Sequence, residues 1–307
     1  MKRSATNRGV ALITAMLITA LAGIVAANLT WDNALDVRRT MNLLNQEQAV
    51  QVALGTENWV SIILRQDLTD SETDHLGEIW AIELPGLLID GGDVTGNIED
   101  LQGRFNVNNL IDESGQIVIH SLQRFRRLLV ALELDPRFAD IAADWIDSNI
   151  EPTFPNGAED VTYIGVVPPY RSANQNLTNA SEFAALEGMD RHIFNVLRPH
   201  ITALPGITHI NVNTATGPVL QSLDENISAA DVEQLLAERE NVGFAYMQAA
   251  FSSLVTPDVL NTLDESTNYF RLKVVVRIDT VRVTLYSVLQ RDSKGNITPI
   301  LRSFGTT

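Results

Sequence analysis

A long uncharged segment lies near the N-terminus of the chain. Residues 10–29 read VALITAMLITALAGIVAANL and contain no charged side chain. As a helix this segment is about 30 Å long, enough to cross the hydrocarbon core of a bilayer. Lys2, Arg3 and Arg8 precede it, without an acidic residue. Because positive charge is retained on the cytoplasmic side, the pattern predicts a single membrane pass with the remaining chain on the far side.

The helical pattern continues beyond the apolar segment. The first proline is Pro85, and between residues 10 and 66 the only glycines are Gly23 and Gly55. Large apolar side chains recur there at roughly helical spacing: Trp31, Leu35, Leu43, Leu44, Val50, Leu54, Trp59, Ile62 and Ile63. The pattern predicts one helix of about 85 Å. Its first half would lie in the membrane, and its second half would bury one face on a soluble domain.

Alternation of polar and apolar residues predicts a sheet in two separate parts of the chain. Short strands are expected at residues 77–82 and on both sides of Gly91, and the alternation continues through residues 101–110. Residues 269–278, 281–290 and 297–304 predict three antiparallel strands. Helical patterns occupy the interval: residues 121–133, 135–148, 181–188, 190–200, 214–223 and 228–239. The sequence therefore predicts an α+β fold whose sheet is interrupted by a helical insertion of domain size.

Composition and charge exclude several classes of protein. The chain has 22 Lys+Arg against 38 Asp+Glu, a formal net charge of −16. Nucleic acid is not expected as a partner, because phosphate binding needs clustered basic residues. The one basic cluster, residues 124–127, is interpreted as a solvated helix face. There is no cysteine, which excludes disulfides and thiol chemistry. The five histidines are scattered, and no common hydrolase or phosphate-loop motif is present.

The N-terminus resembles that of a type IV prepilin or pseudopilin. A short basic leader ends in Gly9, and an apolar helix follows that later becomes amphipathic. In that family a membrane peptidase cuts after the glycine, here between Gly9 and Val10. The membrane helix is retained and becomes the spine of a fibre.

One position departs from the usual prepilin pattern. The fifth residue after the cut is commonly Glu, but here it is Thr14. A carboxylate in hydrocarbon is costly unless it is paired, and in a fibre its partner would be the terminal amine of the subunit above. Threonine instead bonds the carbonyl four residues earlier in its own helix. The missing Glu therefore suggests a subunit with no neighbour above it.

A polar loop after the helix predicted for residues 135–148 is a candidate calcium site. Oxygen-bearing side chains alternate at its start and recur at its end: Asp147, Asn149, Glu151, Glu159 and Asp160. Calcium takes six to eight oxygen ligands, and alternate residues of an extended loop present them on one side. Asp144, one helical turn earlier, is a further candidate. The spacing alone leaves open a solvated acidic loop without a metal.

Over nearly its whole length the chain resembles the minor pseudopilin K family of the type II secretion system. Besides the leader lacking Glu at residue 14, the matching segments are residues 100–110 (DLQGRFNVNNL), 143–147 (ADWID), 157–160 (GAED), 168–174 (PPYRSAN) and 210–215 (INVNTA). The resemblance implies a pilin-like domain, with its long N-terminal helix packed on an antiparallel sheet, that carries a large inserted helical domain. It implies a structural Ca²⁺ in the helical domain, but not which residues are its ligands.

The role implied by this resemblance is structural rather than enzymatic. Such a subunit lies at the tip of a periplasmic pseudopilus, initiates assembly with minor pseudopilins I and J, and takes part in export of folded proteins across the outer membrane. The expected division is a leader at residues 1–9, a membrane segment at 10–29, a pilin-like domain at 30–110 and 266–307, and an inserted domain at 111–265. The expected location is the inner membrane, where prepilin peptidase acts, with the globular part in the periplasm.

Two other functions remain open from the sequence. One is an uncleaved inner-membrane anchor that carries a periplasmic calcium-binding and partner-binding domain. The other is an anchored hydrolase that uses paired carboxylates, although no assembled acid–base pair is visible in the sequence.

Overall fold

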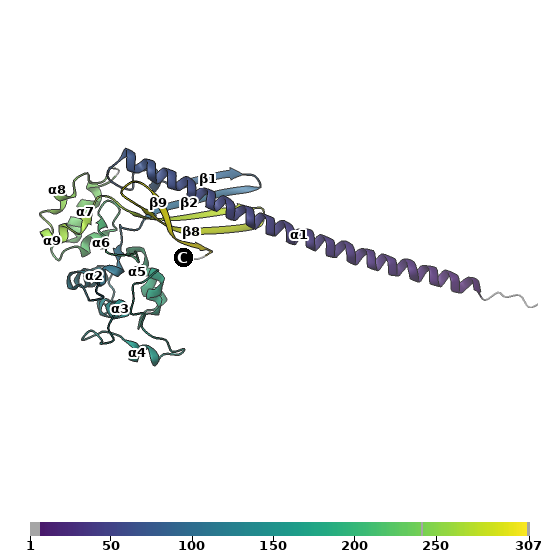
Figure 1. The fold of residues 1–307 in the computed structure, drawn as a ribbon, viewed down its shortest axis with the longest axis horizontal. Coiled ribbons are helices and arrows are strands. Elements are labelled where there is room, and N and C mark those ends of the chain that lie inside the picture. The colour runs from purple at the N-terminus through teal and green to yellow at the C-terminus, as the bar shows by residue number, and fades with distance from the viewer. Residues whose placement is uncertain (1–6, 241, 306–307) are drawn as a thin grey trace, which may run out of the picture.

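A single helix dominates the molecule. The computed structural model describes residues 7–240 and 242–305 (Figure 1). Helix α1 (Asn7–Asp70) contains 64 residues, about 96 Å at 1.5 Å per residue. Its first half projects away from the globular part, and its second half lies along a sheet (Figure 1). The predicted long helix is confirmed and extends beyond residues 10–66 at both ends. Residues 1–6 of the predicted leader lie outside the described residues.

The sheet is antiparallel and is assembled from both ends of the sequence. It contains β1 (Leu84–Ile89), β2 (Gly92–Asp100), β7 (Tyr269–Ile278), β8 (Val281–Arg291) and β9 (Ile297–Phe304), in the order β1-β2-β7-β8-β9. All four strand pairs are antiparallel. The three predicted C-terminal strands are therefore confirmed. Residues 79–81 form a short 3₁₀ helix, η1 (Ile79–Ala81), so the strand predicted for residues 77–82 is wrong. Its Trp80 is buried edge-on against Phe270 of β7.

Helix α1 packs on the sheet through small residues rather than large ones. Its buried positions are Ala49, Ala53, Glu57, Val60 and Leu64, which follow one face of the helix. Alanine on this face lets the helix backbone approach the strands closely.

The prediction that the large apolar residues of α1 form its buried face was therefore largely wrong. Leu43, Leu44, Trp59 and Ile62 are exposed by 42% or more of their surface. Helical spacing did not identify the correct face, because α1 carries apolar residues on more than one side.

The insertion leaves the sheet at the end of β2 and returns at the start of β7. Asp100 lies opposite Phe270 in the register of these two strands, so the points of exit and re-entry are neighbours. Between them two short parallel pairs form, β3 (Phe105–Asn106) with β4 (Ile201–Thr202), and β5 (Ile210–Asn211) with β6 (Leu263–Asp264). The alternation at residues 101–110 produces only β3 and the 3₁₀ helix η2 (Val107–Leu110), not a full strand.

The other regular elements of the insertion are helices joined by loops. Its helices are α2 (Ile119–Ala131), α3 (Phe138–Ile146), α4 (Asp160–Ile164), α5 (Arg191–Leu197), α6 (Gly217–Ser222), α7 (Ala229–Glu238), α8 (Met247–Phe251) and α9 (Pro257–Leu260). Two 3₁₀ helices, η3 (Ala180–Ala185) and η4 (Arg198–His200), complete it. Predicted segment 181–188 is thus a 3₁₀ helix, and α4, α8 and α9 were not predicted. Helix α7 begins at a capping box formed by Ser228 and Asp231.

The insertion has its own hydrophobic core. Phe105, Phe125 and Phe183 pack in sequence, with ring centroids 5.1 and 6.0 Å apart. A separate core lies between α1 and the sheet. The arginines of α2 do not form a solvated face, contrary to expectation. Arg124 is buried and donates to the Thr262 hydroxyl at 2.8 Å, and Arg127 donates to the Ser222 carbonyl at 2.8 Å.

Buried asparagines join the insertion to the sheet and also connect segments within the insertion. Asn211 donates to the Asp100 carboxylate at 2.9 Å and to the Asp74 carbonyl at 3.0 Å. Asn108 binds both the amide and the carbonyl of Leu177, each at 2.9 Å. These residues belong to the segments 100–110 and 210–215. Their amides satisfy the polar backbone groups of loops that have no regular ladder.

Candidate functional site

The first candidate site is the beginning of the apolar part of α1. Gly9 and Val10 lie within α1, which already begins at Asn7. The helix contains one segment long and apolar enough to cross a membrane, with a mean hydropathy of 2.5 and no part of that segment buried. The Thr14 hydroxyl donates to the Val10 and Ala11 carbonyls, each at 3.0 Å. The expected bond to the i−4 carbonyl is therefore present, so Thr14 is satisfied within its own helix.

The second candidate site is the acidic loop that follows α3. Asp144, Asp147 and Glu159 are buried, each with 3% or less of its surface exposed. Asp144 accepts the Thr153 backbone N–H at 2.9 Å. Asp147 ends the helix and accepts from the Asn149 backbone at 3.2 Å and from its side-chain amide at 2.7 Å. The three carboxylates lie close enough for their charges to interact.

Burial and mutual repulsion make the three carboxylates unusually weak acids. Burial raises the pKa of Asp147 to about 6; hydrogen bonds from Asn149 oppose this rise, and the charges of Asp144 and Glu159 add to it. Burial also raises the pKa of Asp144 and of Glu159; the Asp140 charge adds to the rise at Asp144, and the Asp144 charge adds to the rise at Glu159. Glu159 Oε1 is buried without a hydrogen-bond partner among the described residues. An oxygen-lined site with one unpaired carboxylate oxygen fits a hard cation such as Ca²⁺.

The remaining predicted ligands lie at the edge of this group. Asn149 and Glu151 are exposed, and Asn149 Oδ1 accepts the Glu151 backbone N–H at 2.7 Å. Asp160 is half-buried and accepts the Ser172 N–H at 3.1 Å and its hydroxyl at 3.0 Å. Arg171 lies 3.8 Å from the Asp160 carboxylate. Asp160 is therefore partly neutralised, unlike Glu159.

Three residues that were not predicted as ligands also shape this site. The Ser172 hydroxyl donates to Glu159 at 2.8 Å. Asn174 donates to the Asn149 carbonyl at 2.8 Å and has a buried side-chain oxygen without a partner among the described residues. Gly157 lies so close to Asp144 that an added Cβ would be 2.0 Å from Oδ2. Ser172 and Asn174 belong to the segment 168–174, whose polar residues were the available signal.

A tighter acidic group lies where α1 meets the insertion. Asp67, Asp74 and Glu78 have ligand atoms within 4.8 Å of one another, the one such trio among the described residues; the calcium candidates are more widely spaced. Arg291 of β8 already pairs with Asp67 at 3.1 Å and contacts Asp74 directly. Burial raises the pKa of Asp74, against the Arg291 charge. This trio holds the end of α1 to the sheet and to Thr267, whose N–H donates to Asp74 at 2.7 Å.

A helix long enough to span a membrane, packed on an antiparallel sheet into which a helical domain is inserted, defines a pilin-like class of protein. Models of the type II secretion system (T2SS) protein K family match residues 103–206 and 210–265. The type II secretion system protein K of Pseudomonas aeruginosa is 36% identical over 97% of this chain and 93% of its own length. The protein K of Aeromonas hydrophila is 29% identical over 97% of each chain. The chain therefore belongs to the type II secretion system protein K family.

The fold agrees with a solved complex. The crystal structure of the GspK-GspI-GspJ complex from the enterotoxigenic Escherichia coli type 2 secretion system contains a matching chain, with a TM-score of 0.77 and 22% identity. The match covers 88% of this chain and 100% of the other. The predicted α+β class is confirmed by this likeness.

Proposed function

We propose that this chain is the minor pseudopilin at the tip of a type II secretion pseudopilus. Prepilin peptidase would remove residues 1–9 and leave Val10 at the start of a helix held in the inner membrane. The globular part would lie in the periplasm, start fibre assembly, and take part in export of folded proteins. Its role would be structural, without a catalytic step.

The observation that carries the tip position is the local satisfaction of Thr14. Its hydroxyl bonds two carbonyls of its own helix, so it needs no amine from a subunit above. A second feature supports the same position. The inserted domain lies at the end of the sheet opposite the apolar half of α1 (Figure 1). A domain of that size would obstruct a subunit stacked directly above it.

The uncovered side of α1 supports packing against other pseudopilins. Leu43 and Leu44 are exposed by 64% and 63%, and Trp59 by 42%. Large apolar side chains left exposed along a helix are available for packing against a partner. The complex formed by the E. coli relative makes pseudopilins I and J the expected partners.

Calcium is proposed as a structural ion in the acidic loop. Asp144, Asp147 and Glu159 would hold it, with Asn149, Glu151 and Asp160 available at the edge. A bound cation would relieve the repulsion among the buried carboxylates and tie the loop to α3. Calorimetric titration of chelator-treated protein should give heat of binding and a higher melting temperature, and Asp147→Ala with Glu159→Ala should abolish both. Absence of binding heat, together with an unchanged melting temperature, would refute the calcium site.

Crosslinking tests the tip position. Because the chain has no cysteine, Leu44→Cys supplies a single reactive thiol on the uncovered side of α1, and Thr298→Cys supplies one on the sheet. Crosslinks from Leu44→Cys should reach pseudopilins I and J at one fibre end. Repeated recovery of this chain from mid-fibre, with its own kind above and below, would refute the tip position.

A further inference from the structure

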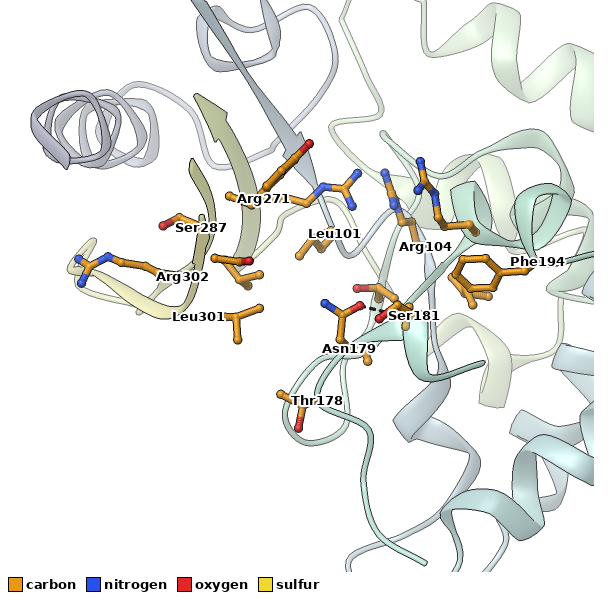
Figure 2. Close-up of a pocket in the computed structure, with 18 residues that line it drawn as sticks. Leu101, Arg104, Thr178, Asn179, Ser181, Phe194, Arg271, Ser287, Leu301 and Arg302 are labelled. Carbon is orange, nitrogen blue, oxygen red and sulfur yellow. Dashed lines mark hydrogen bonds between the residues drawn. The ribbon is translucent and has the colours of Figure 1, made fainter. Parts of the chain in front are cut away.

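A cleft separates the sheet from the inserted domain on the side of the sheet away from α1. Its volume is about 370 Å³, within the usual range of ligand sites. One wall comes from β8 and β9, with Val288 and Leu301, and the other from η3 and α5, with Ser181 and Phe194 (Figure 2). The cleft is therefore built by the junction of the two domains and not by either one alone.

The charge of this cleft is opposite to that of the molecule. The net charge of the chain is −16, yet four arginines and no acidic residue line the cleft: Arg104, Arg198, Arg271 and Arg302. Arg302 points away from it (Figure 2) and pairs with Glu57 at 2.6 Å. Arg104, Arg198 and Arg271 therefore supply the positive charge of the cleft.

These three arginines are incompletely neutralised. Arg104 and Arg271 approach each other from opposite walls (Figure 2) and share a single carboxylate oxygen, Oε2 of Glu99. Burial lowers the pKa of Arg104, and the neighbouring Arg271 charge lowers it further. Arg198 is exposed and forms no ion pair with any described residue. Each guanidinium carries five N–H donors, so most donors are unused by Glu99.

The cleft also lies beside the outer strand of the sheet. Strand β9 is last in the strand order, with no further strand paired to it among the described residues. Leu301 and Arg302 of β9 line the cleft. Outer strands can accept an extended peptide through main-chain hydrogen bonds.

We propose that this cleft binds an extended, acidic segment of a partner polypeptide alongside β9, with its carboxylates on Arg104, Arg198 and Arg271. Apolar side chains of the segment would contact Phe194, Val288 and Leu301. A polypeptide is favoured over an anionic membrane, because the apolar half of α1 projects away from the globular part containing the cleft (Figure 1). This proposal depends neither on the fibre tip nor on calcium.

The test uses the full chain in nanodiscs with one engineered thiol. Ser181→Cys, labelled with an environment-sensitive dye, reports occupancy of the cleft, since the natural chain has no cysteine. The probe is a ten-residue peptide with Glu at every second position and Thr between. The control peptide carries Gln in place of Glu. Saturable binding of the Glu peptide is expected, with the Gln peptide at least about tenfold weaker, the scale of a lost charged hydrogen bond.

Arginine variants locate the site. Arg198→Gln and Arg271→Gln should each weaken binding about tenfold. Arg277→Gln is the matched control on β7: it is six residues from Arg271, on the same strand face, and pairs with Asp93 at 3.0 Å. It should leave binding unchanged. Arg198 is exposed, so its variant keeps the test decisive if Arg271→Gln does not fold.

Three outcomes would overturn the proposal. The first is absence of saturable binding, and the second is equal binding of the Glu and Gln peptides. The third is a dye response to anionic lipid in the nanodisc without a response to the peptide, which would assign the cleft to a membrane surface instead.

Discussion

The loop between α3 and α4 returns so closely over the end of α3 that residue 157 has no room for a side chain. An added Cβ on Gly157 would lie 2.0 Å from Asp144 Oδ2, 2.3 Å from the Thr153 nitrogen and 2.7 Å from its oxygen. The Gly157 N–H donates to the Thr153 carbonyl at 2.6 Å, and Thr153 donates to Asp144 at 2.9 Å. Gly157→Ala must therefore open the loop and break its attachment to Asp144.

The expected cost follows from those contacts. Forcing a methyl group into a packed site costs about 1–3 kcal/mol, and losing a hydrogen bond to a charged group costs about 1.5–3 kcal/mol more. The matched control is Gly165→Ala, at the C-terminal end of α4. An added Cβ there has its nearest contact at 3.5 Å, and the φ of −77° suits alanine. That variant should gain about 0.4–1 kcal/mol by restricting the unfolded chain.

Native-state hydrogen exchange measures the loss of stability in the loop itself. A loss of about 3 kcal/mol should speed exchange in peptides covering residues 147–160 by about 100-fold. Peptides from β7 and β8 should exchange as before, since they lie in the other core. Equal loop protection in Gly157→Ala and Gly165→Ala would refute the close return of the loop over Asp144.

Two further substitutions, Arg291→Met and Asp100→Asn, test the junction between the domains. Arg291→Met leaves Asp67 and Asp74 without their cation and should lower the free energy of unfolding in urea by about 3–5 kcal/mol. The control Arg277→Met breaks an exposed pair and should lower it by under about 1 kcal/mol. Equal losses in the two variants would contradict the buried role of Arg291. Burial raises the pKa of Asp100 to about 6, so the folded state keeps a proton that the unfolded chain releases near pH 4. The contribution of the protonated Asp100 to stability is full below about pH 4 and is lost as the pH rises to 6. Asp100→Asn should therefore make the melting temperature less dependent on pH between about 4 and 6. An unchanged pH dependence in that variant would contradict the raised pKa of Asp100.

The arrangement of elements was predictable where local pattern and tertiary contact agree. Apolar and polar residues alternate along the strands at residues 269–304, because one face of each strand packs on α1 and the other does not. This alternation is visible in the sequence. The long α1 was predictable from its lack of proline. Its buried face was not, because contact with the sheet selected Ala49 and Ala53 over the larger Trp59 and Ile62.

The candidate site was predictable in composition but not in geometry. The positions of Asp147 and Glu159 indicated an oxygen-rich loop, but the sequence does not specify which carboxylates are buried. That depends on the return of the chain at Gly157 and on Ser172, 12 residues beyond the last predicted ligand. The arginine cleft was likewise not predictable, because Arg104, Arg198 and Arg271 meet only when the insertion docks on the sheet.

The mass and N-terminal sequence of the protein recovered from the inner membrane test the central claim most directly. A pseudopilin processed as proposed begins at Val10, and Gly9→Leu should leave the full-length chain, because a bulky residue prevents the cut. A chain from inner membrane containing prepilin peptidase that still begins at Met1, or normal processing of Gly9→Leu, would contradict the account.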